Sequence, residues 1–508
     1  MAEPSAKILR QTLDGEADNI DRLSALPESV LLSILSRLEL KEAAATSVLS
    51  TTWRDLFLQL PNIWLNFHIY GNPSDHPRLF HIFTLFANRV LRERNPEAPI
   101  RFLKVCVRNF TQRMEEDYTS LLMSAAVAVS TYKVYQFDLR LTCSLLIASL
   151  EIAIPPAMFA SDTLTSLRLT ISAGWDVPEN VWLPNVINVH FIPYTLMHEN
   201  STQRFLDGCP RLQDLMLMIG IISNYEIKVK TLRMSSSSLK SLRLGWDQMD
   251  ETETMSIIVK SESLLRLTLS LTGGHKVNVD APNLSFFSIT GEVRELNMTQ
   301  NSPSIDEAVV DVEYTIQSAI HSQNASTFMR ALENARVLDI SEGIMKALYD
   351  STSAMPIFRN LYMLRLIPDY YDDVSRSRIQ QVLFNLLEHC PNLREIFFEK
   401  VMVFDDIHNY IPVNFESAFP PSMVQNLKNL EIFDFRCRNI EYKLVEFFMK
   451  NGQSLEIVSL RKDNVRGSWT PNEEGRILSV MTCSEECDIL FRHKSESKII
   501  YRRNLDSP

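Results

Sequence analysis

The stretch LTSLRL at residues 164–169 has the pattern apolar-x-x-apolar-x-apolar, and this frame recurs along most of the chain. Eleven further copies start at Val186, Leu212, Leu239, Leu264, Leu284, Val309, Ala335, Leu361, Leu393, Leu430 and Leu455. Most successive starts lie 20 to 27 residues apart. One copy alone also fits an amphipathic helix, but a long series at near-constant spacing indicates a repeat architecture.

Each frame predicts one short strand whose alternate residues enter the core, while the x positions face outward on a concave surface. No unit closes a core alone, so neighbouring units stack and share one hydrophobic spine. The period is that of leucine-rich repeats, which span roughly 20–29 residues. We therefore expect an α/β fold with an irregular solenoid and a curved row of parallel strands. Two wider spacings predict insertions that contain Tyr370–Asp373 and Pro420–Pro421.

A different pattern precedes the repeats. The stretch LPESVLLSILSRL at residues 26–38 predicts a short helix, with Pro27 in its first turn. A second helix is expected over residues 41–48, and a third begins after Ser50, a plausible N-cap, and ends at Pro61. Three helices in about 45 residues bury too little apolar surface to be stable on their own. The excess of apolar residues therefore indicates a partner chain.

The segment DRLSALPESVLLSILSRLELKEAAATSVLSTTWRDLFLQLPNIWL, residues 21–65, strongly resembles a plant-type F-box. The matching positions are Leu26-Pro27, Leu31-Leu32, Ile34-Leu35, Lys41-Glu42-Ala43, residues 46–50, Trp53-Arg54 and Leu60-Pro61. The resemblance implies that this module docks on a Skp-type adaptor, which in turn holds a cullin. The implied adaptor-contact residues are Leu26, Pro27, Leu31, Ile34, Leu35, Leu38, Val48, Leu49 and Trp53, some of which must instead form the core of the module.

One position departs from the F-box pattern. Family members often carry a basic pair directly before the tryptophan, whereas this chain has Thr51-Thr52. A polar pair at this position is expected to weaken adaptor binding without altering the fold.

Residues 66–160 are expected to hold an N-terminal cap and the first repeats. Residues 111–131 predict an amphipathic helix with Leu121, Leu122, Ala125 and Val129 on its core face, and residues 134–141 predict a strand. The stretch IPPAMFASDTLTSLRLT at residues 154–170 and the Cys-Pro-x-Leu units at Cys209 and Cys390 are similar to plant F-box/leucine-rich-repeat proteins. The expected organisation is a tail (1–20), an F-box (21–65), the cap and first repeats (66–160), leucine-rich repeats (161–425), FBD-like C-terminal repeats (426–495) and a tail (496–508).

Composition narrows the class of protein. A chain of 508 residues exceeds a single ordinary core, and 45% apolar with 22% charged residues is typical of folded proteins. A net charge of −11 disfavours nucleic acid as a partner. Seven scattered cysteines and the lack of a signal peptide predict a reduced protein of the nucleus and/or cytoplasm. The sequence has no apolar run of membrane-spanning length, so no membrane partner is expected.

The sequence lacks the motifs of common catalytic sites. The sequence has neither a phosphate-binding Gly-x-x-x-x-Gly-Lys loop nor a Gly-x-Ser-x-Gly elbow. Cys483, Cys487 and His493 lack the second ligand pair typical of zinc sites, and Cys437 lacks a visible activating base. We therefore predict a non-catalytic protein with no cofactor, no metal and no catalytic residue. Trp175, Trp182 and Trp246 are candidate recognition residues, although packing is the commoner role of such residues.

The leading hypothesis is a substrate-recognition adaptor of an SCF-type cullin ubiquitin ligase. The F-box is expected to bind the Skp-type adaptor, and the solenoid to hold a target protein near the ubiquitin carrier. Two alternatives stay open: a ligase-independent repeat scaffold with a degenerate F-box, and a receptor of the same ligase type that needs a small molecule. The concave positions Arg168, His190, Arg243 and Arg365 are where a target is expected to touch, and they are mixed in sign.

Overall fold

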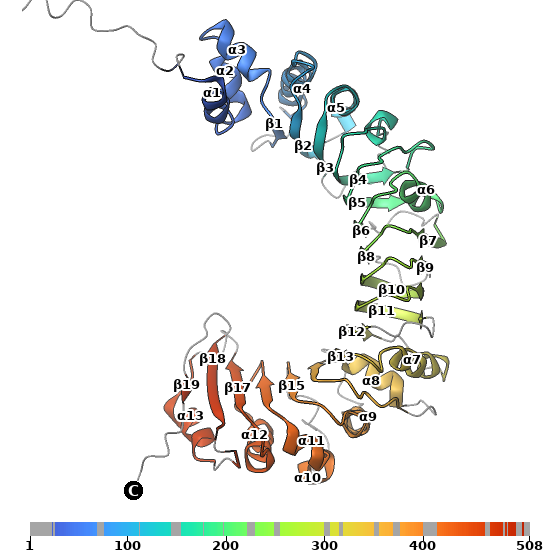
Figure 1. Cartoon of the computed structure of the whole chain (residues 1–508), viewed down its shortest axis with the longest axis vertical. Helices are drawn as coiled ribbons and strands as arrows, with labels where there is room; N and C mark the ends of the chain where they lie inside the picture. Colours follow the sequence, from blue (N-terminus) through green and yellow to red (C-terminus); the bar gives the residue numbers. More distant parts are fainter. Residues whose placement is uncertain are drawn as a thin grey trace, which may run out of the picture. The chain divides into compact units, whose positions relative to one another are not determined.

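The structure is a computed structural model, and its elements are shown in Figure 1. It describes residues 23, 26–68, 76–110, 112–143, 154–175, 177–196, 198–220, 229–247, 255–298, 305–313, 319–349, 355–368, 376–399, 414–462, 468–480, 483–484, 486–493 and 500–501. Contacts divide the chain into two compact units, Met1–Arg140 and Leu141–Pro508.

The first unit begins with a module of three short helices, as the sequence predicts. These helices are α1 (Glu28–Leu35), α2 (Leu40–Thr46) and α3 (Thr51–Phe57). Ser50 caps α3, because its Oγ accepts the backbone N–H of Trp53 at 3.3 Å. Leu31 and Leu35 of α1 are buried, as are Trp53 and Leu56 of α3, against which α1 packs.

The rest of the first unit has the strand–helix alternation of repeats. Its elements are β1 (Asn62–Phe67), α4 (His76–Arg92), β2 (Ile100–Phe110), a 3-10 turn (Gln112–Met114), α5 (Glu115–Thr131) and β3 (Val134–Cys143). β1 and β2 pair in parallel from Asn62–Phe102 onward. The helix and the strand predicted after residue 110 are confirmed, and the four residues expected on the core face of α5 are buried.

The repeat frame therefore starts earlier than the sequence reading placed it. Leu60, Ile100 and Val134 each begin an apolar-x-x-apolar-x-apolar run whose three apolar members are buried. The three-helix module passes into this array without a linker, because Leu60 ends the module and opens the first frame. The buried Arg94 joins the two parts, since its Nη2 donates to the carbonyl oxygen of Leu60 at 2.8 Å.

The second unit is built on one long row of parallel strands. The strands are β4 (Ser166–Trp175), β5 (Asn188–Leu196), β6 (Asp214–Gly220), β8 (Ser241–Asp247), β10 (Arg266–Asp280), β11 (Phe286–Met298), β12 (Glu307–Glu313), β13 (Val337–Ser341), β14 (Met363–Ile367), β15 (Glu395–Phe398), β16 (Asn429–Ile432), β17 (Ile457–Lys462) and β18 (Asp488–His493). Each strand pairs in parallel with the next, and β19 (Ile500–Tyr501) adds an antiparallel edge.

The register of this row explains the repeat period. One buried residue of every strand lies in register with its neighbours: Leu167, Val189, Leu215, Leu242, Leu267, Phe287, Ala308, Leu338, Leu364, Ile396, Leu430, Val458 and Ile489. Each repeat therefore contributes one residue to a continuous hydrophobic ladder, which no single unit could bury. The predicted α/β repeat fold with a parallel strand row is confirmed.

A second, shorter row of parallel strands packs behind part of the first. It comprises β7 (Thr231–Ser235), β9 (Ser256–Lys260) and the second halves of β10 and β11. β11 bends between the two rows at Gly291, whose φ of 99° is in the left-handed region that favours glycine. A Cβ at this position would overlap the carbonyl oxygen of Leu271, so the bend requires glycine.

Helices cover the same side of the row elsewhere in the second unit (Figure 1). They are a 3-10 turn (Pro156–Phe159), α6 (Ser201–Asp207), α7 (Ala319–Ala331), α8 (Glu342–Tyr349), α9 (Arg376–Glu388), α10 (Phe415–Ala418), α11 (Pro421–Asn426), α12 (Asn439–Asn451) and α13 (Pro471–Leu478). α9 fills the first predicted insertion, whose residues Tyr370–Asp373 lie outside the described residues, and α10 with α11 fills the second.

Two predicted frames are out of register and need correction. The frame placed at Val309 starts at Ile305, because Ile305, Ala308 and Val310 are the buried members and Val309 faces outward. The frame placed at Leu430 starts at Leu427 for the same reason. Leu427, Leu430 and Ile432 are buried, while Phe433 is half-buried on the opposite face.

Candidate adaptor-binding and target-binding surfaces

The three-helix module exposes a set of large apolar side chains. We call this set the module's apolar face: Leu23, Leu26, Pro27, Val30, Ile34, Leu38, Val48 and Leu49. Val30 and Ile34 lie one turn apart on α1, and Leu26 and Leu38 flank this helix at the same four-residue spacing. Val48 and Leu49, in the turn after α2, are 88% and 67% exposed. So much exposed apolar surface on so small a module marks an interaction site.

The structure sorts the nine residues predicted to contact an adaptor. Leu31, Leu35 and Trp53 are at most 4% exposed, so they form the module's own core and are not available to a partner. Some of the nine were expected to form the core, and these three do so because α1 is apolar on two sides, one of which packs on α3. The remaining six are exposed: Leu26, Pro27, Ile34, Leu38, Val48 and Leu49. Adaptor contact through these six stays a prediction.

The polar pair that departs from the F-box pattern lies beside this face. Thr51 and Thr52 form the exposed first turn of α3, directly after Leu49 and the capping residue Ser50. Their exposure means that a basic pair would fit at the same positions without disturbing the core.

The strand row of the second unit presents a continuous surface, which we call the open face. It consists of the residues of β4–β18 that alternate with the buried ladder and point away from the core. Its central line is in register from strand to strand: Arg168, His190, Met216, Arg243, Thr268, Ser288, Val309, Asp339, Arg365, Phe397, Glu431, Ser459 and Leu490. The four residues predicted to touch a target all lie on this line.

Two arginines on the open face stack on phenylalanine rings. The guanidinium of Arg461 lies 4.6 Å from the ring centre of Phe433, and that of Arg365 lies 5.7 Å from the same ring. Arg365 also covers Phe397 at 5.6 Å. Arginine and aromatic side chains that are partly exposed and held in place are typical of recognition hot spots.

Each of these arginines is also held by a carboxylate. Arg365 Nη1 donates to Asp339 Oδ2 at 3.1 Å, and Arg461 Nη2 donates to Glu431 Oε1 at 2.9 Å. Burial raises the pKa of Asp339, and the positive charge of Arg365 opposes this shift. The negative charge of Glu307 raises the pKa further. Neighbouring carboxylates therefore repel one another on this part of the open face.

The candidate recognition tryptophans have different surroundings. Trp246 is buried, so its role is packing, and the side chain of Trp175 lies outside the described residues. Trp182 is 59% exposed, and its Nε1 donates to Asp162 Oδ1 at 3.1 Å. The sequence reading missed Trp64 on β1, which is 58% exposed and meets Phe102 edge-on.

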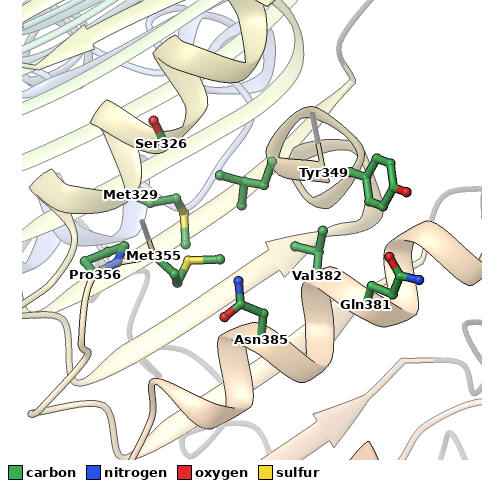
Figure 2. Close-up of a pocket in the computed structure, with 9 residues that line it drawn as sticks. Ser326, Met329, Tyr349, Met355, Pro356, Gln381, Val382 and Asn385 are labelled. Atoms are coloured by element: carbon green, nitrogen blue, oxygen red, sulfur yellow. The ribbon is translucent and has the colours of Figure 1, made fainter. Parts of the chain in front are cut away.

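A pocket lies on the helix side of the second unit, between α7, α8 and α9. Its volume is about 210 Å³, and it is lined by Ser326, Met329, Leu348, Tyr349, Met355, Pro356, Gln381, Val382 and Asn385. Figure 2 shows the thioethers of Met329 and Met355 pointing into it. The pocket is smaller than the roughly 300–1,000 Å³ of typical small-molecule sites. Because α7 and α8 cover the core side of β11–β13, a ligand here would not reach the open face.

Three of the described cysteines, Cys209, Cys390 and Cys437, lack the environment of nucleophiles. Burial raises the pKa of Cys209 and of Cys390 to about 12, and burial with the nearby Glu473 raises that of Cys437. An activated thiol needs the opposite shift. Within the described residues, no group of three His, Cys, Asp or Glu side chains is arranged to hold a metal ion. No described helix combines the length and apolarity needed to cross a bilayer.

Comparisons with known proteins agree with this architecture. Residues 23–65 match the model of the F-box domain, which covers the three-helix module and β1. Residues 138–318 match the model of the LRR repeats of the FBD-associated F-box protein At5g56370.

Relatives match along nearly the whole chain. The Arabidopsis thaliana F-box/FBD/LRR-repeat protein At5g22660 is 24% identical over 484 residues, which cover 92% of this chain and 96% of the relative. The F-box/LRR-repeat protein At2g42720 of the same plant is 25% identical over 488 residues, covering 92% and 99% of the two chains. A third relative, the F-box/FBD/LRR-repeat protein At5g22700, is 26% identical over 492 residues, covering 93% and 98%.

A helical module with an apolar face, followed by a parallel strand row with an open face, defines a repeat-based binding protein. The two family models mark an F-box module and leucine-rich repeats, and the chain is similar along nearly its whole length to plant F-box/leucine-rich-repeat proteins.

Proposed function

We propose that this F-box protein is the substrate-recognition subunit of an SCF-type cullin ubiquitin ligase. The module's apolar face binds a Skp-type adaptor, and the open face of the repeats binds a target protein. The observation that carries the proposal is the exposure of Val48 and Leu49, at 88% and 67%, beside the apolar stripe of α1. These side chains add nothing to the core of the module, so their apolar character is explained by a partner.

The join between the module and the first repeats supports a positioning role. Arg94 holds the carbonyl of Leu60, and the backbone N–H groups of Arg101 and Phe102 donate to the carbonyl oxygen of Pro61 at 2.7 and 3.2 Å. The first strands are therefore tied directly to the module that binds the adaptor. In this role the chain performs no bond chemistry and contributes proximity, because a bound target meets the ubiquitin carrier at raised effective concentration.

The test is binding of the purified full-length chain to a purified Skp-type adaptor, measured by calorimetry. The first variant, Val48→Ser/Leu49→Ser, removes apolar side chains that contribute nothing to the core. The second, Leu26→Ala/Pro27→Ala, shortens the start of the same face. The matched control is Leu79→Ala/Ile82→Ala, which removes comparably exposed apolar side chains from α4 in the same unit.

We expect tight binding by the parent and the control, and a loss of at least about tenfold in both face variants. Circular dichroism should show that all four proteins keep the parent's fold. A folded parent that does not bind the adaptor would overturn the proposal and favour a ligase-independent repeat scaffold with a degenerate F-box. Equal weakening in the α4 control would show that general apolar stickiness, not the module's face, carries the binding.

A further inference from the structure

Charged side chains on the open face are segregated along the strand row. Across β4, β5, β6, β8 and β10, the open-face positions whose side chains the structure describes hold the guanidinium groups of Arg168, Arg243 and Arg266 and one carboxylate, Asp214. Arg168 lies 3.3 Å from the ring nitrogen of His190, and Arg266 stacks on Phe286 at 4.1 Å. We call this part of the open face the basic zone.

The next strands reverse the balance. Across β12–β16, including the residue that directly follows β15, the described open-face positions hold one guanidinium group, that of Arg365. They hold six carboxylates: Glu307, Asp311, Asp339, Glu395, Glu399 and Glu431. We call this part the acidic zone. Asp339 already neutralises Arg365, so the zone keeps a negative excess.

The rim beside the acidic zone does not cancel this excess. Its cations are engaged with their own neighbours: Arg336 lies 3.9 Å from Asp306, and Lys428 lies 2.5 Å from Glu456. Arg394 donates to the backbone carbonyl of Asn426 at 3.0 Å. A carbonyl does not cancel the charge of Arg394, so these five rim residues sum to one positive charge, which offsets only a small part of the negative excess.

Crowding of like charge opposes folding, and the acidic zone shows its effect. Glu307 and Glu399 both raise the pKa of Asp339, in the same direction as its burial. Such an arrangement stabilises neither the core nor the strand pairing, which both depend on the apolar ladder. A binding surface explains it, since separated potentials select a partner and fix its register.

We infer that the open face binds an extended segment of the target that carries an acidic block and a basic block, with the acidic block on the basic zone and the basic block on the acidic zone. Neighbouring strands are about 4.8 Å apart, and the middle strands of the two zones, β6 and β14, are six strand positions apart, which is roughly 29 Å. An extended chain rises about 3.3 Å per residue, so the centres of the two blocks are about nine residues apart.

This inference rests on the proposed function, because it specifies the target that the repeats recognise. Its test does not depend on adaptor binding. The probe is a synthetic peptide with four glutamates, five neutral residues and four lysines, whose block centres are nine residues apart. The reference peptide has the same composition with glutamate and lysine alternating. Fluorescence anisotropy measures the binding of both to the full-length chain at low and at high salt.

Charge reversal locates the site. Arg243→Glu/Arg266→Glu reverses the basic zone, and Glu307→Lys/Asp311→Lys/Glu395→Lys/Glu399→Lys reverses the acidic zone. A combined sixfold variant reverses both, so that the same peptide fits in the opposite direction. The controls are Arg233→Glu on β7 and Glu333→Lys after α7, each of which makes one charge change of the same kind at an exposed position away from the open face.

We expect the parent and both controls to bind the two-block peptide about tenfold tighter than the alternating one, with the preference falling as salt rises. Each single-zone reversal should abolish the preference, and the combined sixfold variant should restore it. Equal affinity for the two peptides, or equally tight binding of a purely acidic or purely basic peptide, would overturn the inference. A failed adaptor test combined with a clear peptide preference would overturn only the ligase role.

Discussion

Acidification should loosen the corner between the two strand rows of the second unit, because His275 is buried there in its neutral form. His275 is fully buried, and its Nδ1 accepts the backbone N–H of Met255 at 3.2 Å. Trp246 lies edge-on to its ring at 5.9 Å. Burial lowers the pKa of His275 to about 4, a shift that a weaker hydrogen bond with the backbone of Thr272 partly opposes.

The sign and size of the effect follow from this shift. The unfolded chain takes up the proton near pH 6.5, whereas the folded chain resists it down to about 4. The unfolded state therefore binds more protons between these values, and stability is fully present above pH 6.5 and is lost as the pH falls toward 4. A shift of this size corresponds to roughly 3 kcal/mol. A protonated Nδ1 also cannot accept the Met255 N–H, so the loss concentrates at β9 and β10.

Hydrogen–deuterium exchange of the segment 255–260 measures this directly. Between pH 7 and pH 4.5, the protection of the backbone amides in this segment should fall, after correction for the pH dependence of intrinsic exchange. In His275→Asn, whose Oδ1 replaces the acceptor but does not titrate, the additional loss should disappear. The segment 457–462 in β17 serves as an internal reference. If the parent and the variant lose protection at β9 equally, another group controls the pH response and the reasoning is refuted.

Three further perturbations test the same architecture. Leu35→Ala should destabilise the three-helix module by about 2–5 kcal/mol, whereas Ile34→Ala, at the exposed neighbouring position, should cost less than about 0.5 kcal/mol. Exchange protection over residues 28–57 measures both effects. Gly291→Ala should lower the free energy of unfolding in urea by about 3 kcal/mol, because alanine there combines a positive φ with an overlap with the backbone. An unchanged free energy would show that β11 bends without a glycine. Arg365→Met should lower the free energy of unfolding by about 2 kcal/mol, because it leaves the buried carboxylate of Asp339 without its ion-pair partner. In a double-mutant cycle, Asp339→Asn in the same chain should recover most of that loss.

The repeat array was largely predictable from the sequence, because each strand depends on a local pattern. Ten of the twelve frames match the buried ladder, and Ser50 caps α3 as its residue type suggests. The two frames that failed have apolar residues at competing positions. Val309 follows Ala308 and precedes Val310, so apolar spacing alone allowed two registers. Only pairing with the neighbouring strand decides between them.

First repeats were expected within residues 66–160, but their frames escaped prediction for a different reason. Leu60, Ile100 and Val134 are separated by α4 and α5, each of 17 residues, so their spacing exceeds the usual repeat period. The adaptor-binding face was predictable as a stretch but not residue by residue. A short helix that is apolar on two sides does not reveal which side its own module buries.

The parallel register also explains why the target-binding surface is the least predictable part of the fold. The buried ladder fixes where each strand lies, and the residues that alternate with it make no contribution to that ladder. Open-face residues such as Arg243 and Glu307 are therefore free to change sign without cost to the core. Their character follows from the partner, and only the register of the strands brings them into zones. The charges of the zones Arg168–Arg266 and Glu307–Glu431 each come from at least three strands, so neither zone is visible as a charge run in the sequence.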